Sequence, residues 1–315
     1  MSGKRKTLWD YRRNFLMLAP FFILFSIFYL APLVYGLYVS FFKWDGVHAP
    51  VFNSINNYQA VITSRYFVKA FTNLAKYVII TMFFGITIAF GLALLVSRFK
   101  GLASNIFRSA YFLPTVIPLF LTATIWRWIL TPDYGILNRL LAPLIMSMNQ
   151  LLAPLGVAPM NPTISWLTDP KFMIAAAVIV DVWRSTGFNM IILLAGLKGI
   201  DEVYYDAAKV DGANTWQQVL YVTIPQLEPV LFLVIVNGFI SALQVFDVPW
   251  LISNSEYRSY GGPLQGMMFP VMDIMGRAFG SLKFGEASAY AWLLLIVVMI
   301  ITMIQFIWRR RYRDW

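Results

Sequence analysis

Two ionisable side chains interrupt a long apolar run in the second half of the sequence. Asp181 and Arg184 are three residues apart, and Ser185 and Phe188 follow on the same helical face. Trp183 lies on an adjacent face, from which we expect it to reach the edge of the same cavity. Ionisable groups inside an apolar helix are costly and usually face a cavity or another helix, so this face is a candidate ligand path.

A second polar face occurs in the next apolar run. Asn237, Ser241 and Gln244 are spaced i, i+4 and i+7, and Asp247 approximately continues the line. Two such faces beside aromatic side chains suit a neutral sugar, because hydroxyls need donors and acceptors while the C–H face of the ring packs on aromatic carbon. Arg184 is equally compatible with an anionic saccharide.

Three other interpretations of these polar groups stay open. In the first, Asp181 and Arg184 merely neutralise each other as an intrahelical ion pair, and the later polar side chains bond to a neighbouring helix. In the second, Asp181 or Asp247 is the coupling carboxylate of a stand-alone ion- or proton-coupled secondary transporter. In the third, the chain is a membrane scaffold that transports nothing.

The polar segment 198–226 contains two short helical stretches separated by a glycine. Acidic side chains crowd the start of the first stretch, where they suit the positive end of the helix dipole. Gly212 permits a left-handed stop or bend, and Asn214 is a good N-cap for a second stretch that is expected to end at Thr223, before Pro225. The acidic residues are Asp201, Glu202 and Asp206.

Large apolar side chains on the same segment distinguish it from a solvated connector, which is the alternative interpretation. An exposed loop with this many apolar groups is expected to have a partner. They are Tyr204, Tyr205, Val210, Trp216 and Leu220.

Catalytic and nucleotide-binding patterns are absent from the sequence. No Gly-x-x-x-x-Gly-Lys-Ser/Thr loop occurs, so any nucleotide that drives transport must be bound by another polypeptide. The chain has no cysteine and a single histidine, His48, which is expected to be solvated in a polar loop. Neither a metal cluster nor a nucleophile–base pair can be assembled from these residues, so we expect no enzyme activity and no cofactor in this chain.

The elements that carry these groups must be membrane helices. Of the 315 residues, 59% are hydrophobic and 13% are charged, and the mean hydropathy is +0.66. Soluble domains contain about 25% charged residues, so roughly half of the usual charge is missing. The net charge of +10 then indicates basic loops at a lipid surface and not a nucleic-acid partner.

Six apolar runs are long enough to cross a bilayer core about 30 Å thick as helices. They predict an all-α, polytopic membrane protein with six transmembrane helices. The spans are expected at about 15–42, 72–97, 109–130, 172–197, 228–250 and 287–308. Segment 140–168 also lacks charge, but four prolines break it, so we expect a loop with a short interfacial helix near Leu140–Leu152.

Basic residues set the expected sidedness of the six spans. With the N-terminal tail 1–14 inside, segments 98–108, 198–226 and 309–315 also face inside. These four segments carry 14 lysines and arginines, whereas the longer outside segments carry 8. The positive-inside rule therefore predicts cytoplasmic N- and C-termini. The last basic tail, 309–315, is expected to lie at the lipid headgroups.

The interior segment resembles the signature of one family, the permease subunits of binding-protein-dependent ABC importers. That signature is Glu-Ala-Ala, three residues, Gly, nine residues, then Ile-x-Leu-Pro. Here Asp206-Ala207-Ala208 is followed after three residues by Gly212 and after nine more by Val222-Thr223-Ile224-Pro225. The departures are Asp for Glu, Val for Ile and Ile for Leu.

This resemblance implies the fold of a type I ABC importer permease and a coupling role for the loop. In the family the loop docks in a cleft on a cytoplasmic ATPase subunit, and ATP and Mg are bound there. The positions that would make this contact are Tyr204, Tyr205, Asp206, Ala207, Ala208, Asp211, Gly212, Ala213, Trp216 and Pro225.

Further stretches resemble the carbohydrate-importer branch, and most of all the larger maltose-type permease. They include Ala31-Pro32-Leu33, Phe112-Leu113-Pro114, Ile125-Trp126-Arg127-Trp128 and Gln244-Val245-Phe246-Asp247. The long segment 139–170 and the absence of a large insertion after the second span are departures. The resemblance implies a bacterial inner-membrane protein that works with a second permease, two ATPase subunits and an extracytoplasmic sugar-binding protein.

The same resemblance implies which residues meet the carbohydrate and the binding protein. Substrate contacts in the family map onto the two polar faces and their neighbours. They fall on Asp181, Trp183, Arg184, Ser185, Phe188, Gly238, Ser241, Ala242 and Val245, beside Asn237 and Gln244. The outer loop at Gly261-Gly262-Pro263 is expected to face the binding protein.

Overall fold

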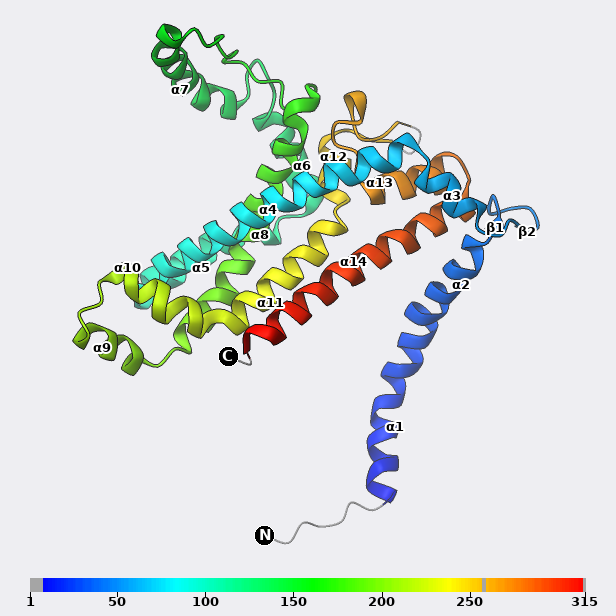
Figure 1. Cartoon of the computed structure of the whole chain (residues 1–315), viewed down its shortest axis with the longest axis horizontal. Helices are drawn as coiled ribbons and strands as arrows, with labels where there is room; N and C mark the ends of the chain where they lie inside the picture. Colours follow the sequence, from blue (N-terminus) through cyan, green and yellow to red (C-terminus); the bar gives the residue numbers. More distant parts are fainter. Residues whose placement is uncertain (1–7, 257–258, 314–315) are drawn as a thin grey trace.

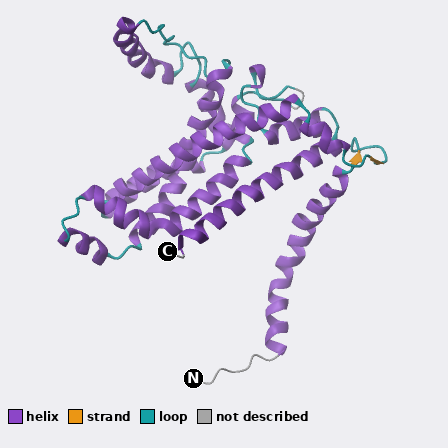
Figure 2. Ribbon diagram, viewed as in Figure 1, coloured by secondary structure: helices purple, strands orange, loops and turns teal. Residues whose placement is uncertain are grey.

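The computed structural model describes residues 8–256 and 259–313, and helices form most of it (Figure 2). Four long helices run alongside one another as a bundle (Figure 1): α4 (Arg65–Ser97), α8 (Pro170–Lys198), α11 (Ile224–Leu243) and α14 (Phe284–Arg313). One small antiparallel pair, β1 (Phe42–Lys43) with β2 (Val51–Phe52), accompanies them.

Close helix contact in the bundle depends on small residues. A Cβ on Gly187 of α8 would overlap the Tyr111 carbonyl oxygen of α5 (Gly101–Val116), so glycine lets these two backbones meet. The core between α4, α8 and the loop before α13 (Pro270–Met275) is built on large buried side chains, among them Tyr77, Met173 and Phe269.

The bundle has two distinct ends (Figure 1). We call one the α9 end, because α9 (Glu202–Val210), α10 (Thr215–Gln218) and the last turn of α14 lie there. We call the other the α12 end. It carries α3 (Asn56–Ile62), α12 (Asp247–Ile252), α13, the short η4 (Pro263–Gln265) and η5 (Gly276–Gly280).

The first predicted span is one helical rod that leaves the bundle. It comprises α1 (Leu8–Phe25), a π-turn η1 (Ser26–Leu30) and α2 (Ala31–Ser40), and only α2 packs on α14. From Leu16 on, its apolar side chains are largely exposed, as expected for a helix surrounded by lipid or by another subunit. Part of the predicted N-terminal tail 1–14 and the end of the tail 309–315 lie outside the described residues.

The predicted third span, 109–130, is wrong as a single helix. Helix α5 begins earlier, at Gly101, and meets α6 (Leu119–Ile129) at a bend of 96°. Pro118 lies at the break: it has no N–H to donate, and it disfavours a helical conformation in Ile117 before it.

The predicted fifth span also needs correction. The range 228–250 contains a break, because α11 ends at Leu243 and α12 starts only at Asp247. At its other end the helix starts earlier than predicted, since α10, the π-turn η3 (Val219–Thr223) and α11 form one apolar stretch from Thr215 to Leu243. The expected stop at Thr223 is therefore wrong. The wide π-turn carries the helix past Pro225.

The proline-rich segment after α6 forms a longer helix than expected, α7 (Ile136–Leu152), followed by η2 (Ala153–Leu155). By length and composition alone, Ile136–Leu155 passes as a further span. It nevertheless projects away from the bundle (Figure 1). If α5 and α6 are counted as one bent span and α7 is left out, the described residues contain six candidate spans, the number predicted.

One arginine of the basic tail 309–315 makes contacts within the bundle. Arg309 on α14 pairs with Glu228 on α11, with Nε and Oε1 2.9 Å apart, and its guanidinium lies over the Phe232 ring at 4.4 Å. The ion pair and the cation–π contact together link α14 to α11 at the α9 end.

His48 is exposed to solvent in a loop, as the sequence led us to expect, and it also has a hydrogen-bond partner. Its Nδ1 lies 2.5 Å from Asp45 Oδ2 in the loop between β1 and β2. This hydrogen bond raises the pKa of His48 above its ordinary 6.5, and the same contact holds the pKa of Asp45 well below its usual range.

We expect Asp45→Asn to return the pKa of His48 to about 6.5. Because the folded-state pKa of His48 is raised, the charged pair supports the loop below the ordinary histidine pKa, and this support is lost as pH rises through the raised value. The chain has one histidine, so NMR of imidazole-labelled protein reports this site alone. An unchanged titration in the Asp45→Asn variant would contradict the assignment.

Candidate functional site

A cavity of about 410 Å³ lies among α4, α8 and α11 and reaches the segment that joins α11 to α12. It contains both polar faces predicted from the sequence. The predicted residues that line it are Asp181, Arg184, Ser185, Phe188, Asn237, Gly238, Ser241, Ala242, Gln244 and Val245, and Asp247 lines it as well.

Trp183 is the predicted residue that does not line this cavity. Its ring packs edge-on against Trp126, with centroids 5.5 Å apart. Both tryptophans line a separate, mostly apolar groove of about 640 Å³ between α4, α5, α6 and α8. The expectation that Trp183 reaches the edge of the polar cavity is therefore wrong, because its position on α8 turns the ring toward α6.

Asp181 and Arg184 form a loose pair. The closest oxygen and nitrogen are 3.8 Å apart, which is too long for a hydrogen bond. The Arg184 side chain is 36% exposed, and its Nε has no hydrogen-bond partner among the described residues. The pair therefore offsets two charges but leaves donors and acceptors available to the cavity.

Other polar groups of the two faces are partly satisfied by their own helices. The Ser185 hydroxyl donates to the Asp181 carbonyl at 2.8 Å, and the Asn237 amide donates to the Leu233 carbonyl at 3.0 Å. Both side chains keep acceptor oxygens that these bonds do not use.

The sequence analysis missed the contribution of α4. Tyr77 and Thr81 line the cavity, and their buried hydroxyls have no hydrogen-bond partner within the described part of the chain. A signal was available, because Tyr77, Thr81 and Gly85 are spaced i, i+4 and i+8 in an uncharged run and share one helical face. All three line the cavity.

A second feature lies at the α9 end, where residues 201–223 form a protrusion that we call the knob (Figure 1). The Asp201 carboxylate caps α9 by accepting from the Val203 N–H at 3.0 Å. The helix ends at Val210, and Gly212 just beyond it has a φ of +81°. The N–H groups of Gly212 and Ala213 donate to the carbonyls of Lys209 and Ala208, which is the Schellman arrangement.

Asn214 then starts α10 with a complete capping box. Its side chain accepts from the Gln217 N–H at 3.0 Å, and the Gln217 side chain accepts from the Asn214 N–H at 2.8 Å. The Tyr205 hydroxyl lies 3.1 Å from the Thr223 hydroxyl and ties α9 to η3. The bend between the two helices is thus fixed by caps on both sides.

The knob presents a large apolar surface. Side chains that are 51% to 88% exposed cover it, and a soluble surface would not normally gather so many. They are Val203, Tyr204, Val210, Trp216 and Tyr221. Among the predicted coupling residues, Asp206, Ala207, Asp211, Gly212 and Pro225 are also exposed, whereas Ala208, Ala213 and Tyr205 are half-buried.

Asp206 pairs with Lys209 one turn further along α9, with oxygen and nitrogen 2.8 Å apart. This hydrogen bond raises the pKa of Lys209, so that residue stays charged over the whole neutral range. The pair adds a polar edge to the apolar surface.

The predicted outer loop lies at the α12 end. Its two glycines are needed for the backbone conformation and close packing of the loop, and they are not exposed contact residues. Gly261 and Gly262 have φ of +81° and +66°, and added Cβ atoms would strike Met268 and Met173. Asn73 on α4 donates to two carbonyls of this loop at 3.0 Å. Pro263 is the exposed member of the predicted trio.

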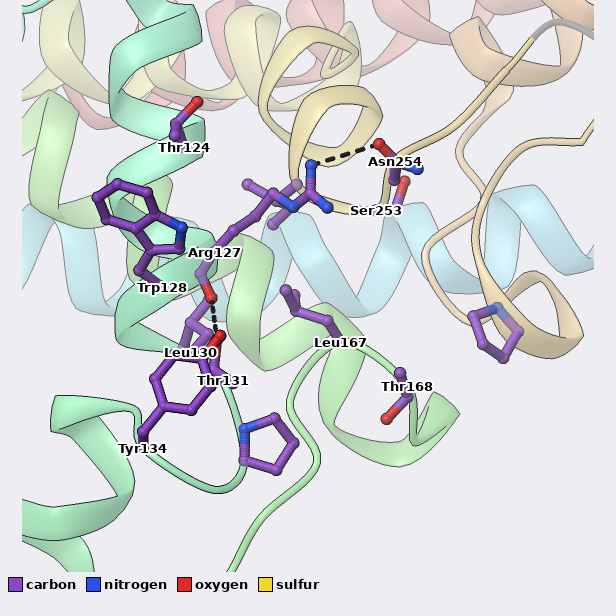
Figure 3. A pocket seen from close by; sticks show the side chains of 13 residues that line it. Thr124, Arg127, Trp128, Leu130, Thr131, Tyr134, Leu167, Thr168, Ser253 and Asn254 are labelled. Atoms are coloured by element: carbon purple, nitrogen blue, oxygen red, sulfur yellow. Dashed lines mark hydrogen bonds between the residues drawn. The ribbon is translucent and has the colours of Figure 1, made fainter.

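Pro263 borders an outer pocket of about 540 Å³ at the α12 end. Figure 3 shows Arg127 at its centre, donating to the Asn254 side chain at 3.3 Å, with Trp128 and Tyr134 to one side. The sequence analysis assigned no site here.

Residues 81–314, which run from α4 through α14, match the family described as the inner membrane component of binding-protein-dependent transport systems. The chain belongs to this family. It is therefore a multi-pass membrane component of a transport system and not an enzyme.

Two relatives align with this permease over nearly its whole length. The probable ABC transporter permease protein YesP of Bacillus subtilis (strain 168) is 30% identical over 97% of this chain and 93% of that protein. The lactose transport system permease protein LacF of Rhizobium radiobacter is 29% identical over 93% of this chain and 92% of that protein.

A solved structure has the same fold. It is a chain of a bacterial alginate ABC transporter in complex with an alginate pentasaccharide-bound periplasmic protein. The TM-score is 0.75 at 22% identity, and 98% of each chain is covered. The prediction of an all-α, polytopic ABC importer permease fold is confirmed.

Proposed function

We propose that this permease is one half of the membrane channel of an ATP-driven carbohydrate importer. The observation that carries the proposal is the cavity in which the polar faces of α8 and α11 meet beside Tyr77 and Phe188. Its mixture of hydroxyl, amide, charged and aromatic groups suits a hydroxyl-rich ligand. LacF, a relative of similar length, is named for lactose transport.

The other half of the path would come from a second, similar permease. The polar groups of α4, α8 and α11 belong to one side of a route, and a route through a membrane must be enclosed by protein. An extracytoplasmic binding protein would deliver the carbohydrate at the α12 end, beside Pro263. On this proposal the α9 end and both termini would lie on the cytoplasmic side of a bacterial inner membrane, in agreement with the distribution of basic residues.

The knob is proposed as the contact with a cytoplasmic ATPase. Its exposed apolar side chains need a partner, and its two capped helices give it a fixed shape. Because the sequence has no phosphate-binding loop, ATP and Mg would be bound by two separate ATPase subunits. Their closure would favour one orientation of the knob and so shift the permease pair between inward-open and outward-open states.

Reconstitution of the co-purified complex tests this function. The complex is placed in liposomes, and ATP hydrolysis is measured against a panel of sugars, each with the loaded binding protein. We expect one class of sugar to stimulate hydrolysis. Absence of an associated ATPase, or hydrolysis that no loaded binding protein changes, would refute the proposal. Transport by the permease alone, driven by an ion gradient, would favour the stand-alone alternative, for which family membership gives no support.

A further inference from the structure

The arm formed by α7, η2 and the return segment to residue 168 is the largest part of the chain that neither the cavity nor the knob uses. Figure 1 shows it projecting from the body beyond α6. One face of its helix carries a stripe of large apolar side chains, each 49% to 76% exposed. The stripe consists of Ile136, Leu140, Leu144, Met148, Leu151 and Leu155.

The opposite face of α7 is already covered by the arm itself. The Asn149 side chain exchanges two hydrogen bonds with the Met160 backbone, at 2.7 and 2.8 Å. Buried Asn138 donates to the Ile164 carbonyl at 2.9 Å and accepts from the Trp166 indole at 2.8 Å. The return segment therefore packs on the face of α7 that lies away from the stripe, and it leaves the stripe itself uncovered.

These bonds also decide against a transmembrane arm. Asn138 lies in the first turn of α7, and its partners Ile164 and Trp166 lie at the end of the return segment, so the chain leaves the arm where it entered. The return segment from Gly156 is irregular, and irregular backbone is not tolerated in contact with hydrocarbon. One face of the arm must therefore meet water or headgroups.

The composition of the stripe and its surroundings favours lipid over protein on the other face. Arg139 is the only charged residue between 136 and 168, and it lies beside the stripe, where a cationic side chain suits phosphate headgroups. Helix α6, which leads into the arm, also has exposed apolar side chains, Phe120 and Leu121. Trp128 and Tyr134, at the root of the arm, are exposed aromatics of the kind found at membrane interfaces.

We propose that the α7 arm lies flat on the membrane at the α12 end, with its stripe among the acyl chains and its return segment in water. The partner of this surface is the lipid bilayer. An in-plane amphipathic helix buries its apolar face a few ångströms below the headgroups. It would hold the bent α6, and with it the outer pocket, at a fixed depth.

The chain contains no cysteine, so single cysteines can be labelled without background. We would place a nitroxide at Leu140, Leu144 or Leu151 of the stripe. Gln150→Cys is the matched control, because Gln150 is one residue from Leu151 of the stripe but on a different face of α7. The labelled complex is reconstituted in vesicles of three parts phosphatidylcholine to one part phosphatidylglycerol.

Accessibility to oxygen, which concentrates in hydrocarbon, is compared with accessibility to a water-soluble nickel chelate. We expect the oxygen-to-nickel ratio to be several-fold higher at stripe positions than at the control. Equally low ratios at stripe and control positions would place the arm in water and overturn the proposal. Stripe labels shielded from both reagents would indicate a protein partner, and high ratios on all faces would indicate a span, and either result also overturns it. The measurement does not depend on ATP hydrolysis, so it stands apart from the test of transport.

Discussion

The variant Gly212→Val is expected to reduce substrate-stimulated ATP hydrolysis of the assembled transporter roughly tenfold. Gly212 has a φ of +81°, and this conformation costs a β-branched residue about 1–3 kcal/mol. The Schellman turn would open to relieve that strain, so α9 would change its angle to α10. Coupling between sites is typically about 1–3 kcal/mol, so a misplaced knob can abolish most of it.

The matched control is Gly156→Val. Gly156 has a similar φ of +69°, and an added Cβ meets nothing within 4 Å at either glycine. Gly156 lies in the α7 arm, far along the chain from the knob. We expect Gly156→Val to leave stimulated hydrolysis within about twofold of the original, because the strain there acts on no coupling contact. Equal losses in both variants would show that strain, and not the knob, is responsible.

Arg184→Ala should reduce stimulated hydrolysis and uptake by roughly tenfold or more while the complex still assembles. A hydrogen bond from a charged group contributes about 1.5–3 kcal/mol, and the loose 3.8 Å contact with Asp181 leaves the guanidinium free to make one. Arg65→Ala, at an exposed position on α4, is the control for loss of one arginine.

The double variant Asp181→Asn with Arg184→Gln separates a ligand contact from mutual neutralisation. If the two charges only offset each other, each single variant leaves a charge unpaired, and the double variant recovers assembly and transport. If Arg184 binds substrate, the double variant assembles but stays inactive. Recovery of uptake in the double variant would therefore remove Arg184 from the proposed substrate path.

Much of this architecture could be predicted because lipid leaves few choices. Long apolar runs must be helices, and polar residues at i, i+3 and i+4 must share a face, so the cavity residues of α8 and α11 were identified before their packing was known. The knob was also predictable, because Asp201, Gly212 and Asn214 act locally through caps and a left-handed turn.

The features that could not be predicted depend on tertiary contacts. Nothing local fixes the angle of 96° between α5 and α6, although Pro118 indicates that a break is possible. The sequence also gives no sign that Trp126 of α6 packs against Trp183. The fold of the arm depends on Asn138 and on partners 26 and 28 residues away. Hydrogen bonds between residues so far apart leave no periodic pattern in the sequence from which the fold of the arm could be predicted.

One continuous helix links the two ends of the proposed mechanism. From Thr215 in the knob to Leu243 beside the cavity, 29 residues form a single helical stretch, which at 1.5 Å per residue is a rod about 44 Å long. A tilt imposed on the knob therefore travels to the cavity within one piece of secondary structure and crosses no subunit boundary on the way. The π-turn at 219–223 interrupts the regular α-helical hydrogen bonding of this rod, so in the proposed mechanism its stiffness would set how much of an ATPase movement reaches Gln244.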